Sequence, residues 1–146
     1  MRYKFILPVT LSLILASVVC CRDDKDDAKT MDGTWVPASA ELAGDKWPDE
    51  FLKKMKLVTK GDKYTVTFGQ VTDQGTVKLD PGKKPKSMDI IGTEGPNKGK
   101  TFLAIYELTK DELKVCYNLD GKERPTAFAT KSGTQLFLVT YKREKS

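Results

Sequence analysis

The stretch TEGPNKGKT, residues 93–101, ends in the Gly-Lys-Thr triplet that is typical of phosphate-binding loops. Such a loop needs a further glycine five residues before Gly99, and it must follow a strand and begin a helix. Glu94 stands at that position, and the residues after Thr101 read FLAIYEL, which favours a strand. A phosphate would therefore find no helix N-terminus there. We interpret the stretch as a loop that joins two strands, and we expect no nucleotide.

The other residues that could do chemistry lack the partners that catalysis needs. The chain has no histidine, which excludes Ser–His–Asp and Cys–His activation and every metal site that contains histidine. Cys116 has no base to activate it, and its place in a strand-like segment predicts a buried structural thiol. Asp111-Glu112 and Asp49-Glu50 are pairs of sequence neighbours, and neighbours on a strand point to opposite faces and cannot flank a cleft together. We interpret the two pairs as turn and helix-start residues. We predict no catalytic residue, no metal site and no cofactor, and therefore a protein that is not an enzyme.

The elements that must position the remaining residues are predicted to be strands. Short apolar alternations recur from Gly33 onward with turn signals between them. We predict eight strands: Gly33–Glu41, Leu57–Lys60, Lys63–Phe68, Gly75–Asp80, Lys86–Gly92, Thr101–Leu108, Glu112–Asn118 and Gln135–Arg143. Their connections are short enough for antiparallel neighbours, and eight such strands close most simply into a barrel that has no exposed edge.

One helix is predicted, from Pro48 to Met55, after the first strand. Pro48 suits the first helical position, and the two acidic residues that follow it suit the first turn. We expect this helix to be the only substantial one and to lie across one end of the barrel. The fold class is therefore all-β, with an eight-stranded antiparallel barrel and one short helix.

Aromatic residues recur on the predicted strands and are candidates for lining a ligand cavity. They are Tyr64, Phe68, Phe102, Tyr106, Tyr117, Phe137 and Tyr141. The same residues could fill the core, because a barrel of eight strands can either pack its interior or hold one small ligand. The short strands favour a small or filled interior, so the sequence leaves both alternatives open.

The first residues of the chain have the pattern of a secretory signal. Arg2 and Lys4 precede the apolar stretch Phe5–Val19, which is shorter than the ~20 residues of a membrane-spanning helix. The adjacent Cys20 and Cys21 then resemble the end of a bacterial lipoprotein signal, in which the lipid-bearing cysteine becomes the mature N-terminus. We predict a signal peptide over residues 1–20, lipid attachment at Cys21, a charged flexible tether over residues 21–30 and the barrel domain over residues 31–146. The protein is then exported, either anchored in the cell envelope or secreted.

Residues near the two ends of the domain resemble the calycin pattern shared by lipocalins and fatty-acid-binding proteins. Gly33-Thr34-Trp35 opens the first strand, and Arg143 ends the last one. The resemblance implies that Trp35 closes the barrel floor and that the guanidinium of Arg143 stacks on its indole. Because the first and last strands must pair to close the barrel, the two residues can meet.

Most of the body also resembles a family of small exported bacterial proteins with a Planctomycetes-type uncharacterised lipocalin-like domain. The resembling segments are DGTW (32–35), KLVTKGDKYTV (56–66), KLDPGKKPKSMDI (78–90), TEGPNKGKT (93–101), IYEL (105–108), LKVCY (113–117) and ERPTAF (123–128). They follow one another in order over roughly residues 31–143, so the resemblance depends on its length and not on one motif. It implies no established activity.

Two functions are compatible with this sequence. The first is a non-catalytic lipocalin-like protein that holds a small apolar or amphipathic ligand. The alternative is an accessory or inhibitor lipoprotein of the envelope that acts through its loops and has a filled barrel. A wide apolar cavity would favour the first function, and an exposed apolar patch on the loops would favour the second. We expect a monomer that binds no nucleic acid, because a net charge of +5 is modest for that role.

Overall fold

The computed structural model describes residues 24–145. The predicted signal peptide and the predicted lipid-attachment site Cys21 lie outside these residues. None of the described helices is long and apolar enough to cross a membrane.

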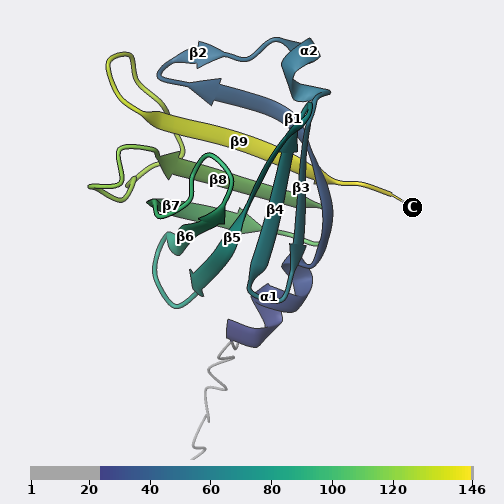
Figure 1. Cartoon of the computed structure of the whole chain (residues 1–146). Coiled ribbons are helices and arrows are strands. Elements are labelled where there is room, and N and C mark those ends of the chain that lie inside the picture. Colours follow the sequence, from purple (N-terminus) through teal and green to yellow (C-terminus); the bar gives the residue numbers. More distant parts are fainter. Residues whose placement is uncertain (1–23, 146) are drawn as a thin grey trace, which may run out of the picture.

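The described strands form one antiparallel sheet that closes on itself (Figure 1). They are β1 Gly33–Leu42, β2 Asp45–Lys46, β3 Met55–Lys60, β4 Lys63–Phe68, β5 Val71–Asp80, β6 Lys86–Glu94, β7 Thr101–Leu108, β8 Glu112–Asn118 and β9 Leu136–Arg143. Each strand from β3 to β8 pairs with the next one, and β1 pairs with both β3 and β9. Since β2 is a two-residue extension beside β1, the barrel itself has eight strands. The predicted all-β, lipocalin-like barrel is confirmed.

The long strand β1 closes the barrel by changing partners along its length. Its first residues, Gly33 to Trp35, pair with β3, and the stretch from Trp35 to Leu42 pairs with β9. The register with β9 shifts between Pro37 and Ser39. A β-bulge of this kind bends a strand and increases its twist, which helps a sheet to curve around.

The predicted strands are all present, and the differences lie at their ends. β5 begins at Val71 and not at Gly75, and β3 begins at Met55 and not at Leu57. The predicted helix Pro48–Met55 is reduced to a single turn, α2 Asp49–Leu52. This turn lies at one end of the barrel together with β2 (Figure 1). Met55 belongs to β3 because it pairs with Phe68 of β4.

The longer helix is one that the sequence did not predict. Residues 24–30, expected to be part of a flexible tether, lie in helix α1 Asp24–Met31, and both Asp27 and Met31 are buried. α1 lies at the opposite end of the barrel from α2 (Figure 1). We call the end with α1, where β1 begins and β9 ends, the closed end. We call the other end, with α2 and the loop between β6 and β7, the open end.

The densest packing of the interior is close to the closed end. The largest side chains with less than 2% exposure on the inner faces are Trp35, Tyr106, Tyr141, Leu113, Val115 and Val139. Trp35 is the third residue of β1, Leu113 follows the first residue of β8, and Tyr141 comes near the end of β9. At the open end, by contrast, Phe68 and Val71 remain 36% and 51% exposed.

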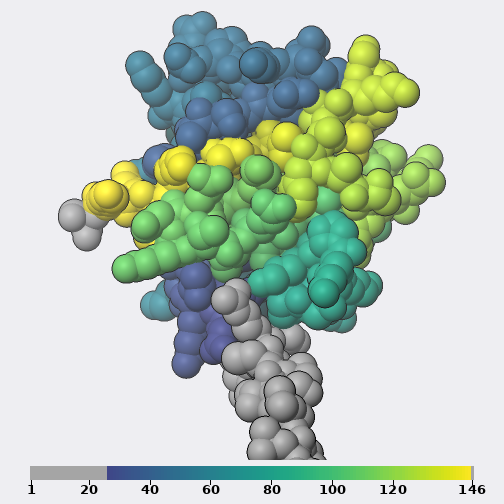
Figure 2. Space-filling model, turned by 180° about the vertical axis from the view of Figure 1, so that it is seen from behind, coloured from purple at the N-terminus to yellow at the C-terminus, as the bar shows by residue number. Residues whose placement is uncertain are grey.

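A long connection, residues 119–135, covers part of the outer surface of the barrel. Beneath it lies Cys116, fully buried, with its Sγ 3.7 Å from the carbonyl oxygen of Ala129. Arg124 fastens the connection by donating to the carbonyl oxygens of Met88 and Ala104 and by pairing with Asp89 at 2.6 Å. Figure 2 shows the connection in yellow-green beside β9 in yellow.

Candidate ligand-binding site

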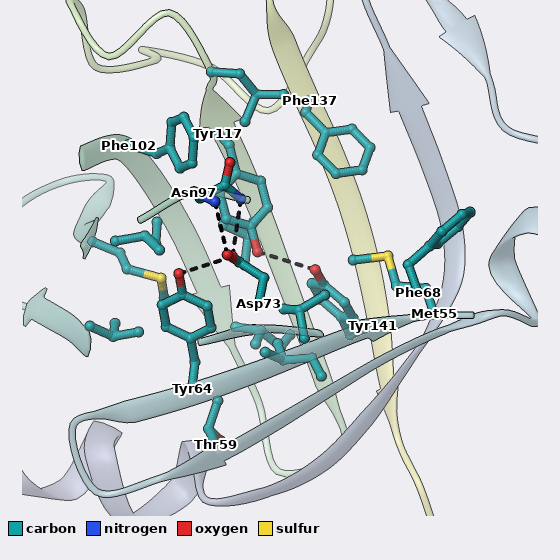
Figure 3. A pocket seen from close by; sticks show the side chains of 18 of the residues that line it. Met55, Thr59, Tyr64, Phe68, Asp73, Asn97, Phe102, Tyr117, Phe137 and Tyr141 are labelled. Atoms are coloured by element: carbon teal, nitrogen blue, oxygen red, sulfur yellow. Dashed lines mark hydrogen bonds between the residues drawn. The ribbon is translucent and has the colours of Figure 1, made fainter. Parts of the chain in front are cut away.

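A cavity of about 320 Å³ occupies the barrel interior (Figure 3). Every strand from β3 to β9 contributes side chains to its wall, and most of them are apolar. They include Met55, Leu57, Val66, Phe68, Val71, Val77, Met88, Ile90, Phe102, Leu113, Val115, Leu119 and Phe137. A volume of this size lies within the range of sites that hold small molecules. The alternation of each strand therefore produces an apolar interior that is only partly filled.

The cavity extends from the closed end to the open end. Met31 of α1 and Thr59 of β3 lie at its inner limit. Phe68, Val71 and Pro96 line it at the other limit and are also exposed to solvent. These three residues mark the mouth of the cavity, between the β4–β5 turn and the β6–β7 loop.

Aromatic side chains gather beside the mouth. The ring of Trp47 lies 4.9 Å from that of Phe137, measured between centroids. It also meets Phe51 and Phe68 edge to face, at 6.2 and 6.1 Å. Trp47 itself was not predicted as part of a site, because it stands in a connection and outside the alternating strands.

Six of the seven aromatic residues predicted to line a cavity do so. They are Tyr64, Phe68, Phe102, Tyr117, Phe137 and Tyr141. Tyr106 does not line the cavity, and this part of the prediction is wrong. Its side chain is buried at the closed end, where its hydroxyl donates to Asp27 of α1 at 2.7 Å. The expectation failed because it did not include the helix that covers this end.

The polar centre of the cavity wall is Asp73 on β5, which the sequence analysis did not single out. Its carboxylate accepts hydrogen bonds from the Tyr64 hydroxyl at 3.2 Å and from the Asn97 side-chain amide at 3.0 Å. The backbone N–H of Asn97 donates to it at 3.1 Å. Figure 3 shows these bonds meeting at Asp73. Among the described residues that line this cavity, Asp73 has the only charged side chain.

Two glycines let the loop between β6 and β7 reach Asp73. A Cβ atom on Gly92 would lie 2.0 Å from the carbonyl oxygen of Asn97, so only glycine fits beneath the loop. A Cβ atom on Gly75 would lie 2.0 Å from the carbonyl oxygen of Ile91 and 2.7 Å from the ring of Tyr64. Gly75 follows a register shift between β5 and β6. The stretch TEGPNKGKT joins two strands, as predicted. It holds Asn97 over the cavity, where Asn97 donates hydrogen bonds to Asp73 of the barrel wall.

The tyrosine hydroxyls in the cavity wall stay protonated at neutral pH. Burial raises the pKa of Tyr117 to about 12 and that of Tyr141 well above its ordinary value, and the two hydroxyl oxygens lie 3.2 Å apart. Burial, with the nearby carboxylate of Asp73, also raises the pKa of Tyr64. These hydroxyls add neutral hydrogen-bonding groups to the wall, and Asp73 is the one charged group among its described residues.

The closed end is built around Trp35 and Arg143, as the resemblance to calycins implies. The guanidinium carbon of Arg143 lies 4.2 Å from the centroid of the Trp35 ring. Arg143 also donates to the carbonyl oxygens of Asp32 and Lys110, both at 2.7 Å, and to that of Thr30. Arg143 therefore holds the end of α1 and the β7–β8 turn together over the indole.

Helix α1 completes this floor through its last residue. The carbonyl oxygen of Met31 accepts hydrogen bonds from the Trp35 indole N–H at 2.8 Å and from the Thr59 hydroxyl. The last carbonyls of a helix have no partners within the helix, so donors from the barrel satisfy them.

A buried ion pair fixes the middle of α1. Asp27 accepts a bond from Lys86 at 2.8 Å and another from the Tyr106 hydroxyl. The Asp27 side chain is only 8% exposed, whereas that of Lys86 is 25% exposed. The ammonium of Lys86 thus compensates the carboxylate that α1 buries.

The described residues offer little to a reaction. Burial raises the pKa of the Cys116 thiol, which lies on the outer side of the barrel under residues 119–135. Between residues 24 and 145 no three Cys, Asp or Glu side chains come close enough together to hold a metal ion. The arrangement can enclose an apolar group and present one carboxylate and several hydroxyls to it.

No protein-family model, curated protein or solved structure matches this chain. Its class therefore follows from the fold and cavity alone. It is an eight-stranded antiparallel barrel of the lipocalin-like kind, with an interior cavity that opens at one end.

Proposed function

We propose that this protein is a non-catalytic binding protein that holds a small apolar or amphipathic molecule inside its barrel. The observation that carries the proposal is the cavity of about 320 Å³, lined mostly by apolar side chains and reached past Phe68 and Val71. Burial of apolar ligand surface in such a cavity supplies the affinity, and few polar groups fix the orientation.

The chemistry of the wall supports binding over catalysis. The hydroxyls of Tyr64, Tyr117 and Tyr141 have raised pKa values and are poor bases or nucleophiles at neutral pH. In the part of the cavity wall that the structure describes, Asp73 has neither a second carboxylate nor a histidine beside it. The alternative function, an envelope accessory or inhibitor protein with a filled barrel, is less well supported because the interior leaves room for a ligand.

We also propose that the protein is exported and carries a lipid at Cys21, with plain secretion as the other outcome. α1 begins at Asp24 at the closed end, and three residues of extended chain span at most about 11 Å. An anchored protein would thus hold its closed end near the membrane and its mouth away from it. Intact-mass analysis of the membrane fraction should find acyl groups, and Cys21→Ser should release the protein.

Kinship with the Planctomycetes-type lipocalin-like family is likewise a proposal. Its support is the series of resembling segments together with the barrel that contains them. We further propose that the protein acts as a monomer and binds no nucleic acid. The eight described barrel strands all pair on both sides, which leaves only the two-residue β2 with an unpaired edge, and the net charge is modest.

The test of the binding function compares two valines that lie on opposite faces of neighbouring strands. Val66 of β4 lines the cavity, whereas Val58 of β3 is 40% exposed on the outside. Calorimetric titration with decanol, below its solubility limit, should show binding to the unmodified protein and to Val58→Trp. Val66→Trp should fill the cavity and abolish binding. Equal binding to both variants, or no binding to the unmodified protein, would contradict the proposal.

Native mass spectrometry of the protein purified from its own cells is the complementary measurement. A retained small molecule that Val66→Trp no longer carries would identify the ligand. A retained protein chain without a small molecule would support the accessory function instead.

A further inference from the structure

We infer, on the basis of the proposed binding function, that the ligand is a cationic amphiphile whose protonated amine pairs with Asp73 just inside the mouth. Its apolar part then extends toward the closed end. The inference rests on Asp73, a carboxylate in an apolar cavity. The described residues give this carboxylate several neutral hydrogen-bond partners and no cation.

The charge of Asp73 is not compensated by the wall around it. The three groups that donate to it are the Tyr64 hydroxyl and the two N–H groups of Asn97, and all are neutral. Between residues 24 and 145, no lysine or arginine side chain lines the cavity. Asp27 is the instructive contrast, because there a lysine ammonium lies 2.8 Å from the buried carboxylate. A cation interacts more strongly with a half-buried carboxylate in apolar surroundings than with a fully hydrated carboxylate, because the effective dielectric constant is lower there.

The position of Asp73 suits the head of an amphiphile. Asp73 and Val71 are on the same face of β5, and Val71 is 51% exposed at the mouth. Further along that face, Val77 lines the deeper part of the cavity, where the remaining lining residues are mainly apolar. An ammonium at Asp73 would therefore stay near water while its chain is buried.

The three hydrogen bonds to Asp73 also permit a purely structural role, which is to fasten the β6–β7 loop. The two roles differ in what Asp73→Asn should do. The asparagine keeps a side-chain oxygen that can accept a bond from the Asn97 backbone, but it removes the negative charge. A structural role predicts equal effects on charged and neutral ligands, whereas the inferred role predicts a selective loss.

The experiment is a calorimetric comparison of decylamine and decanol at neutral pH, where the amine is protonated. The unmodified protein should bind both ligands. Asp73→Asn should lower the affinity for decylamine about tenfold or more and change the affinity for decanol little. Asp80→Asn is the matched control, because Asp80 ends the same strand outside the cavity and pairs with exposed Lys83. This control should leave both affinities unchanged.

The possible outcomes separate the inference from the proposed function. The inference is wrong and the binding function stands in two cases. Either decanol binds and the affinity for decylamine does not depend on Asp73, or Asp73→Asn lowers the affinity for both ligands equally. If neither ligand binds the unmodified protein, both are wrong. Should Asp73→Asn fail to fold, salt provides the second measurement. Rising salt concentration should lower the affinity for decylamine and not that for decanol, and equal salt dependence of the two affinities would overturn the inference.

Discussion

The two ends of this barrel are made from the same eight strands and differ in what covers them. At the closed end, α1 lies over Trp35, and its carbonyls and carboxylate are bound by side chains of the barrel. At the open end, Phe68 and Val71 remain exposed and the space between the strands is unfilled. The comparison indicates that alternation along the strands creates an apolar interior. The elements that cover each end of the barrel determine whether that end of the interior is a packed core or an open cavity.

The largest expected effect is that of Trp35→Ala at the closed end. The indole is fully buried, stacks on Arg143 and donates to Met31. Its removal should leave a hole and cost about 3–5 kcal/mol of unfolding free energy, measured by denaturant titration. Trp47→Ala at the open end is the matched variant and should cost less, because Trp47 is only half-buried. Equal losses would contradict the contrast between the two ends.

The next effect tests whether α1 is part of the floor. Asp27→Ala should cost about 2–3 kcal/mol of unfolding free energy, because it removes a buried carboxylate that Lys86 and Tyr106 both contact. Asp26→Ala changes an exposed neighbour on the same helix and should cost little. If the two variants unfold at the same denaturant concentration, α1 does not seal this end in solution.

Alkaline pH should loosen the part of the wall where the two ends meet. Burial raises the pKa of Tyr117 from 10.0 to about 12, so the folded state favours the protonated hydroxyl. The resulting stabilisation is complete below pH 10 and is lost as the pH rises through about 12. The loss of unfolding free energy amounts to about 2 kcal/mol at pH 12. Tyr117→Phe cannot ionise, and its unfolding free energy should fall less steeply over this range. Parallel pH profiles for the two proteins would show that Tyr117 is not buried.

The smallest effect is that of Arg143→Lys. An ammonium can neither stack on Trp35 as a planar guanidinium does nor reach three carbonyl groups in the same geometry. We expect a loss of about 1 kcal/mol in unfolding free energy, with decanol binding unchanged because the ligand enters at the other end. Lys142→Arg, the reverse exchange at the exposed neighbouring residue, is the matched control and should change neither stability nor binding. Weakened binding in Arg143→Lys alone would mean that the floor and the cavity are coupled.

Sequence patterns predicted the barrel well because the alternation and turns that define its strands are visible within short stretches of sequence. The alternation in residues 63–68 and the Gly61-Asp62 turn specify a hairpin on their own, and the register between β3 and β4 follows. The beginning of β5 was missed because Val71 to Gln74 are mostly polar. Only their pairing with β4 across a tight turn makes them a strand.

Helix α1 could not be predicted because its stability comes from distant residues. Its sequence, DKDDAKTM, has almost no apolar face. The helix is held instead by Lys86, Tyr106 and Arg143, which lie more than fifty residues away along the chain. Neither periodicity nor propensity contains that information.

The candidate site was predicted in its apolar part and missed in its polar part. The aromatic residues followed from alternation, but Asp73 and Asn97 are 24 positions apart and meet only through a folded loop. The signal that could have found them is the pair of glycines, Gly75 and Gly92. Each stands in a strand where close backbone approach excludes a side chain.

The central claim is that a ligand occupies the interior between the two ends, and an NMR titration of methyl groups with decanol tests it most directly. Val66, Val77 and Ile90 line the cavity, whereas Val58 and Ile91 are exposed on the outer surface. We predict saturable shifts of the three inner residues, with the two outer residues unchanged. Shifts confined to the outer residues, or shifts on both faces that do not saturate, would contradict the account.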